Sequence, residues 1–132
     1  HVIKLLNNFV AQAICTATAE AFAVGAKSGV DLDKLVQVIS AGGVNSGLFQ
    51  LMAKTLQGDY GAMKFELNNA AKDLRYYSHL TESVKVPSII GTSVHQALNT
   101  AVALGYGSEM VPSLVKAQAQ LNQVNIARTT HG

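Results

Sequence analysis

Apolar residues recur every three or four positions along most of this sequence, which is the spacing of amphipathic helices. At the start of the chain Ile3, Leu6, Val10 and Ile14 fall at these intervals, and the pattern continues to Val24. Few segments alternate between polar and apolar residues, and no dipeptide typical of a β-hairpin occurs. The pattern therefore predicts an all-α fold without a sheet.

Glycine, proline and helix-capping residues divide this pattern into about six expected helices. They cover residues 2–28, 31–41, 45–57, 63–84, 87–104 and 112–124. We expect Asp31 to cap the second helix, Pro87 to occupy the first turn of the fifth, and Gly105 to close it. Residues 1–126 are thus expected to form one helical domain, and residues 127–132 a frayed tail.

The first expected helix is long and uncharged for a domain of this size. Residues 2–28 would span roughly 40 Å at about 1.5 Å per residue, and residues 5–19 carry no charge. A surface helix normally shows a charged face, so another surface is expected to cover this one. Either the chain forms a homodimer or a further domain lies over the N-terminal end. The apolar residues to be covered are Val2, Leu5, Leu6 and Phe9.

Composition limits the possible partners. The 132 residues suit one compact domain, and the ten Lys and Arg against eight Asp and Glu are scattered, so no nucleic-acid surface is expected. The segment 86–107 has no formal charge, but His95, Gln96 and Asn99 would be costly in a membrane, so we interpret it as a helix of a soluble bundle. Cys15 is the single cysteine, which indicates a buried small side chain and a reducing, cytoplasmic location.

Lys4 lies at the N-terminal tip of the first expected helix and is followed by Asn7 and Asn8. Lys4 and Asn8 are four residues apart and share a face, which Gln12 continues. A cation is unfavourable at a helix N-terminus, because the helix dipole is positive there. This placement indicates either a solvated lysine without a role or a functional group.

A second set of residues lies in the fourth expected helix. Phe65, Asn69, Lys72 and Tyr76 are spaced four, three and four residues apart, and Asp73 adjoins Lys72. The stripe could bind an anionic ligand, with Lys72 reaching a phosphate or carboxylate, or it could be an ordinary amphipathic face with its charges in water. No Walker loop, catalytic Ser-His-Asp spacing or metal-ligand spacing occurs, so no metal site is predicted.

With these two segments marked, the sequence resembles the C-terminal domain of β-hydroxyacid dehydrogenases. This family includes 3-hydroxyisobutyrate dehydrogenase and tartronate semialdehyde reductase, and it is related to 6-phosphogluconate dehydrogenase. The run "KLLNN", with "AEAFAVGAKSGVDLDKL" downstream of it, matches the family's catalytic K-x-x-N-N segment. The run "FELNNAAKDL" matches an F…KDL segment that closes over substrate and cofactor. The resemblance covers nearly the whole chain.

The resemblance implies a role for each residue of these motifs. Lys4 would be the general acid/base that exchanges a proton with the substrate oxygen during hydride transfer. The implied substrate contacts are Asn8, Asn7 and Phe65, and the implied cofactor contacts are Lys72 and Asp73, with Asp73 fixing Lys72. The implied cofactor is NAD or NADP, and the implied substrate is a small hydroxyacid or its semialdehyde.

The chain departs from the family pattern at two points. Its KDL segment continues with Arg75 and Ser78 where the family usually has a glycine and a later aspartate. It also has no G-x-G-x-x-G after a strand, so we expect a Rossmann domain outside this sequence to bind most of the dinucleotide. The chain is then the substrate and dimerisation half of an oxidoreductase and is inactive alone. The alternative is a non-enzymatic module for dimerisation or for binding small carboxylates.

Overall fold

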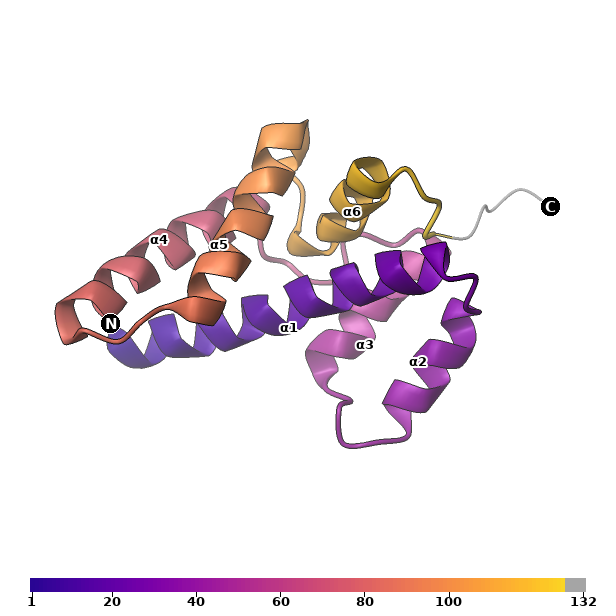
Figure 1. Cartoon of the computed structure of the whole chain (residues 1–132), viewed down its shortest axis with the longest axis horizontal. Helices are drawn as coiled ribbons and strands as arrows, with labels where there is room; N and C mark the ends of the chain where they lie inside the picture. The colour runs from indigo at the N-terminus through magenta and orange to yellow at the C-terminus, as the bar shows by residue number, and fades with distance from the viewer. Residues whose placement is uncertain (128–132) are drawn as a thin grey trace.

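The computed structural model describes residues 1–127, and these form six α-helices (Figure 1). The helices are α1 (Val2–Lys27), α2 (Leu32–Ser40), α3 (Gly47–Ala53), α4 (Leu67–Val84), α5 (Ile89–Ala101) and α6 (Leu114–Asn122). Shorter turns are η1 (Lys54–Gln57), η2 (Val102–Tyr106) and η3 (Val111–Ser113). The described part contains no strand beyond an isolated bridge between Glu66 and Met110, so the all-α prediction is confirmed. The tail predicted over 127–132 lies, apart from its first residue, outside the described residues.

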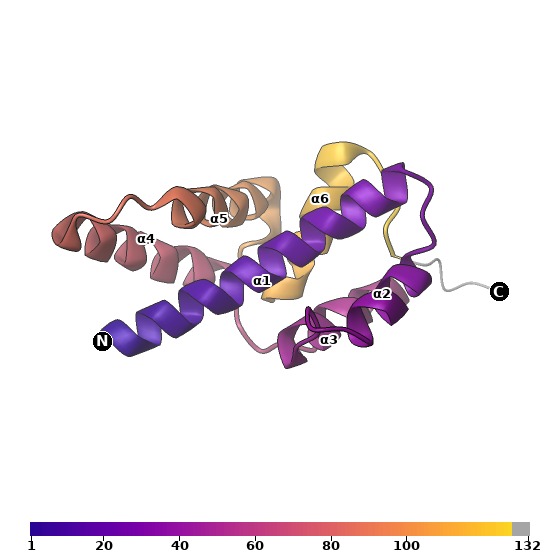
Figure 2. The ribbon, with the colours of Figure 1, turned by 60° about the horizontal axis from the view of Figure 1, so that its bottom comes forward.

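The long helix α1 runs through the whole molecule, and the other helices pack along it (Figures 1 and 2). Helices α4 and α5 lie against its N-terminal half, whereas α2, α3 and α6 lie near its C-terminal half. The tip of α1 therefore lies beside α4, far from α2. This arrangement decides which residues can share a site with Lys4.

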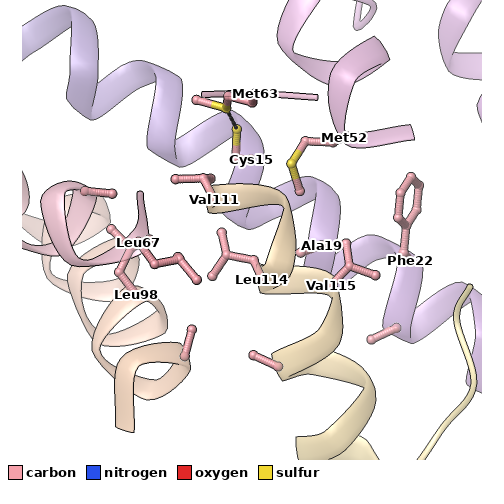
Figure 3. Packing of buried hydrophobic residues seen from close by; sticks show 14 of the residues in the cluster. Cys15, Ala19, Phe22, Met52, Met63, Leu67, Leu98, Val111, Leu114 and Val115 are labelled. Carbon is pink, nitrogen blue, oxygen red and sulfur yellow. Dashed lines mark hydrogen bonds between the residues drawn. The ribbon is translucent and has the colours of Figure 1, made fainter. Parts of the chain in front are cut away.

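The core collects on the inner side of α1 (Figure 3). Cys15 and Phe22 are fully buried, and the Phe22 ring meets Phe49 edge-on, with 6.3 Å between ring centroids. The Cys15 sulfur lies 3.8 Å from the Met63 sulfur. Burial of this kind stabilises the fold by about 1.5–3 kcal/mol for each large side chain. Burial also raises the pKa of the Cys15 thiol to about 12. This agrees with the prediction that Cys15 is a small buried side chain.

Several helix ends follow the predicted capping rules. The Asp31 side chain accepts the N–H two residues later, and the Ser46 hydroxyl accepts the Phe49 N–H at 3.0 Å. Gly58 and Gly105 adopt left-handed conformations, with φ of 86° and 103°, which glycine enters without steric cost. Gly105 lies inside the π-helical turn η2 rather than directly at the end of α5.

Helix α4 begins four residues later than predicted. Phe65 and Glu66 precede it, because the Val111 N–H donates to the Phe65 carbonyl at 2.7 Å and Glu66 forms the isolated bridge. Glu66 itself is extended, at φ −73° and ψ 140°. These two residues therefore belong to a loop edge paired with the segment before α6, which the helical spacing concealed.

Helix α5 begins at Ile89, so the prediction that Pro87 occupies its first turn is wrong. Lys85 ends α4 in a left-handed conformation with φ of 60°. The Thr92 N–H donates to the Ser88 carbonyl at 3.0 Å, which makes Ser88 the N-cap. Pro87 consequently lies in the connection between the two helices.

Within residues 1–127, α1 alone is long and apolar enough to cross a membrane by those two measures. In its most apolar 18-residue window 33% of the residues are buried inside the protein. The core helix of a soluble protein passes the same test, and α1 packs against α3, α4, α5 and α6. Helix α1 is thus the central helix of the bundle, although most residues of that window are not buried within the described part of the chain.

Candidate functional site

The two predicted motif segments meet between the tip of α1 and the start of α4. The Asn8 amide nitrogen donates to an Asp73 carboxylate oxygen at 2.9 Å, across 65 positions of sequence. One residue after Asn8 and four residues after Asp73, the rings of Phe9 and Tyr77 stack with 4.2 Å between centroids and 11° between planes. A polar and an aromatic contact thus hold the tip of α1 against α4.

Beside this contact lies an open hollow of about 350 Å³, here called the α1–α4 hollow. Its lining residues are Lys4, Asn8, Lys64, Phe65, Glu66, Asn69, Lys72 and Asp73. The volume is at the lower end of the range for small-molecule pockets. Five of the six predicted site residues line it. The sixth, Asn7, lies next to it and donates from its amide to Asn8 Oδ1 at 3.4 Å.

The loop that carries Phe65 into the hollow is fixed from behind by the segment before α6. In addition to the Phe65 carbonyl bond, the Leu67 N–H donates to the Glu109 carbonyl at 2.8 Å and the Asn68 N–H to the Gly107 carbonyl at 2.9 Å. A side chain at Gly107 would collide with the Asn68 amide. The first N–H groups of α4 are therefore occupied, and the positive charge of the hollow comes from lysine side chains rather than from the helix terminus.

A small polar cluster stabilises the same segment. Glu109 Oε1 accepts from Lys116 Nζ at 2.8 Å and from Ser113 Oγ at 2.7 Å, and Lys116 Nζ lies 4.6 Å from the centre of the Tyr60 ring. The Lys116 hydrogen bond, followed by that of Ser113, lowers the pKa of Glu109. Burial raises the pKa of Tyr60. The cluster connects the start of the 60–66 loop to α6, so it supports the hollow without lining it.

The hollow gathers three ammonium groups and two carboxylates. Among the described residues the one ion pair within 4.0 Å is Lys116–Glu109, so Lys4, Lys64 and Lys72 are not ion-paired there. The Asp73 carboxylate accepts the Asn8 amide instead of bridging to Lys72. A small anion could therefore bind to these ammonium groups without displacing an existing ion pair. Each ammonium group could donate it a hydrogen bond or a proton.

The spacing predicted that Gln12 continues the stripe of Lys4 and Asn8, but in the structure it does not. Successive residues four apart turn about 40° around a helix of 3.6 residues per turn, so after two steps the side chain faces another direction. Gln12 is fully buried, and neither of its amide atoms has a hydrogen-bond partner among the described residues. It belongs to the core rather than to the hollow.

Lys64 and Glu66 line the hollow although the sequence analysis did not single them out. Both were assigned to a helix, where residues on either side of Phe65 would point about 100° away from it. In the observed loop they flank Phe65 at the rim of the hollow. Their proximity to Phe65 was the one available signal.

Within residues 1–127 no group of three or more His, Cys, Asp or Glu side chains could hold a metal ion.

Comparison with known sequences gives a family match over most of the chain. The model described as NAD-binding of NADP-dependent 3-hydroxyisobutyrate dehydrogenase matches residues 1–118. L-threonate dehydrogenase of Cupriavidus necator is 30% identical over 115 residues, which are 86% of this chain and 38% of that protein. The chloroplastic glyoxylate/succinic semialdehyde reductase 2 of Arabidopsis thaliana is 25% identical, over 87% of this chain and 32% of its own length.

Solved structures show the same fold. A 3-hydroxyisobutyrate dehydrogenase from Salmonella typhimurium superimposes with a TM-score of 0.79 at 25% identity, over 87% of this chain and 40% of that one. The Mycobacterium tuberculosis 3-hydroxyisobutyrate dehydrogenase gives 0.73 at 16% identity, covering 87% and 42%, which supports the fold alone. The chain thus spans between 32% and 42% of the length of these relatives.

Proposed function

The chain belongs to the family of NADP-dependent 3-hydroxyisobutyrate dehydrogenases, and on that basis we propose that it supplies the catalytic helical half of an NAD(P)-dependent oxidoreductase. The proposed reaction interconverts a small β-hydroxyacid and its semialdehyde. Its main support is the α1–α4 hollow, where the two motif segments meet around unpaired lysines. The names of the relatives, which are dehydrogenases and reductases, agree with this class of reaction.

In this proposal Lys4 is the general acid/base. Its side chain lines the hollow and is exposed, so it can reach a substrate oxygen there. As an ammonium it donates a proton to the carbonyl oxygen of the semialdehyde, and as an amine it takes the proton back from the hydroxyl. NAD(P), when bound, supplies or accepts the hydride.

Asn8 and Phe65 position the substrate. Because Asp73 accepts one amide N–H of Asn8, the orientation of that amide is fixed before substrate arrives, which reduces the entropy lost on binding. Asp73 therefore acts through Asn8 in this proposal, and not mainly through Lys72. Phe65 covers the apolar part of the substrate, with Asn7 as a neighbour of Asn8.

The cofactor contact in this chain is assigned to Lys72. The cationic lining suits an anionic cofactor, but a hollow of about 350 Å³ can take only a substrate and the reacting end of a dinucleotide. Most of the dinucleotide is therefore assigned to a Rossmann domain outside this sequence, and the 132-residue chain alone is expected to be inactive.

A homodimer is part of the proposal. Val2, Ile3, Leu6 and Val10 expose 52%, 75%, 44% and 53% of their surface. Leu5 is half-buried and Phe9 stacks on Tyr77, so the exposed apolar flank contains Ile3 and Val10 in place of these two residues.

The decisive experiment compares the complete gene product that contains this chain with its Lys4→Met variant. We expect hydroxyacid-dependent reduction of NAD or NADP, and a loss of kcat of at least about 100-fold in the variant, which is the usual contribution of general acid/base catalysis. Lys34→Met, on the surface of α2, is the matched control and should leave kcat unchanged. Helix content by circular dichroism confirms that each variant is folded.

Three outcomes would contradict parts of the proposal. Unchanged turnover in Lys4→Met removes Lys4 from the chemistry. Turnover by the isolated 132-residue chain, lost on Lys4→Ala, overturns the expected inactivity. A gene product that binds small carboxylates in the hollow but reduces no cofactor favours the non-enzymatic carboxylate-binding module, for which the unpaired lysines are equally suited.

A further inference from the structure

Lys64 is the one lysine of the α1–α4 hollow without a role in the proposed reaction. It lines the hollow beside Phe65 and is exposed. Within the described residues it makes no ion pair. Its Nζ lies near Gly61, 3.8 Å from the point where a Cβ there would stand, and Asp59 Oδ1 lies 4.0 Å from the same point.

The backbone that carries Lys64 is held on both sides. Met63 is buried and its sulfur contacts Cys15 at 3.8 Å. The Phe65 carbonyl accepts the Val111 N–H at 2.7 Å, and the Phe65 N–H donates to the Met63 carbonyl at 3.0 Å. Lys64 thus lies between two anchored residues, and its ammonium group makes no ion pair among the described residues.

The hollow holds one more ammonium group than carboxylates, three lysines against Glu66 and Asp73. A simple β-hydroxyacid has one carboxylate, whereas three lysines face the hollow. Of the two carboxylates there, Asp73 accepts the Asn8 amide and keeps its negative charge, and Glu66 makes no ion pair with the lysines. If Lys4 exchanges the proton and Lys72 approaches the cofactor, Lys64 remains available for an additional anionic group next to Phe65.

We propose that Lys64 binds a second carboxylate of the substrate, so that the preferred substrate is a β-hydroxyacid with two carboxylates. This inference rests on the proposed function and specifies its substrate class. A carboxylate suits one ammonium group with Glu66 nearby, whereas a phosphate carries about −1.5 to −2 charges and would be repelled more strongly. Lys64 is therefore a specificity-determining residue, and it takes no part in the hydride or proton transfer.

The test uses two acids that differ by one carboxylate. They are 3-hydroxyisobutyrate and 2-(hydroxymethyl)succinate, in which a CH2–carboxylate replaces the methyl group. With the complete gene product we expect a higher kcat/KM for the diacid. Lys64→Met should lower that value about tenfold, the order of one charged hydrogen bond, mainly through KM. Turnover of the monoacid should change less than about twofold, since the lost bond is absent there.

Two further variants separate a charge effect from a structural one. Lys64→Arg keeps the charge and should retain most of the preference for the diacid. Lys34→Met removes a lysine from the distant surface of α2 and should leave both acids unaffected. An equal loss for both acids in Lys64→Met would overturn the inference. A change confined to the KM of NADP, with the KM of NAD and the ratio of the acids unaltered, would assign Lys64 to a cofactor phosphate and overturn it too.

Failure of this inference can be told apart from failure of the proposed function. If wild type oxidises both acids and their ratio is the same in Lys64→Met, the inference alone is wrong. If no small β-hydroxyacid is oxidised, the proposed function is wrong, and isothermal titration calorimetry with the diacid decides about Lys64. Binding by wild type that weakens about tenfold in Lys64→Met would still support a carboxylate site, whereas equal or absent binding would exclude it.

Discussion

Replacing Gln12 by methionine should make the protein more stable. The side chain is completely buried, and neither amide atom finds a hydrogen-bond partner among the described residues. It lies on α1, one turn after Asn8, and is one of the buried residues of that helix. Methionine has the same unbranched shape, so the exchange removes the polar atoms without a large change of volume.

The expected gain follows from the cost of the buried amide. Leaving a polar group without a partner in a protein interior costs about 1–3 kcal/mol. Removing that cost should raise the free energy of unfolding by about 1–3 kcal/mol. For a chain of this length the midpoint of thermal unfolding should rise by roughly 4 °C per kcal/mol. Gln12→Ala also removes the amide but leaves a cavity, which offsets the gain, so alanine should be clearly less stable than methionine.

Chemical unfolding followed by circular dichroism at the helix band measures this change directly. The matched control is Gln37→Met on the exposed surface of α2, where substitutions usually change stability by less than about 0.5 kcal/mol. A fall in the free energy of unfolding for Gln12→Met, with an unchanged slope in denaturant, would refute the reasoning. It would mean that the amide makes a stabilising hydrogen bond in solution.

Two further predictions concern the supporting cluster and the flank of α1. The lowered pKa of Glu109 contributes stability above the ordinary value of 4.5, and this stability is lost as the pH falls through the folded value. Lys116→Met should reduce this contribution, because only the Ser113 hydrogen bond remains. The free energies of unfolding of wild type and variant should differ by less than about 1 kcal/mol at pH 7, since the Lys116 and Glu109 side chains are both over a third exposed. This difference should vanish near pH 2, and an equal difference at both pH values would contradict the prediction. Light scattering at micromolar concentration should give a dimer of the 13.9 kDa chain and a monomer for Leu6→Lys, and a monomeric wild type would contradict the homodimer.

Helix ends that are capped by a side chain close in sequence follow local rules, and the Asp31 cap was predicted in this way. Asp31 and Ser46 accept N–H groups two and three residues away, so capping rules suffice to find them. The start of α4 is different, because it depends on Val111 and Glu109 from a segment over 40 residues later. No local pattern contains that partner, and the helical spacing around Phe65 therefore extended the helix too far.

The same distinction applies to the candidate site. The motif spacing places Lys4 with Asn8, and Phe65 with Lys72, within single segments, and the fold then brings the two segments to one hollow. The side chains that the sequence analysis missed or placed wrongly are those whose direction depends on tertiary structure. Lys64 faces the hollow because its segment is not helical, and Gln12 faces the core because the face of α1 rotates along its length.

Gly91 lies outside both motif segments, but its lack of a side chain affects the packing next to the hollow. A Cβ at this position of α5 would lie 2.6 Å from the Tyr77 ring, closer than side chains approach in proteins, so glycine lets that ring lie flat between α4 and α5. The ring can then stack on Phe9, and this contact brings the tip of α1 close enough to α4 for Asn8 to reach Asp73. Gly91 therefore acts on the hollow indirectly, because it leaves space for the Tyr77 ring that stacks on Phe9 of α1.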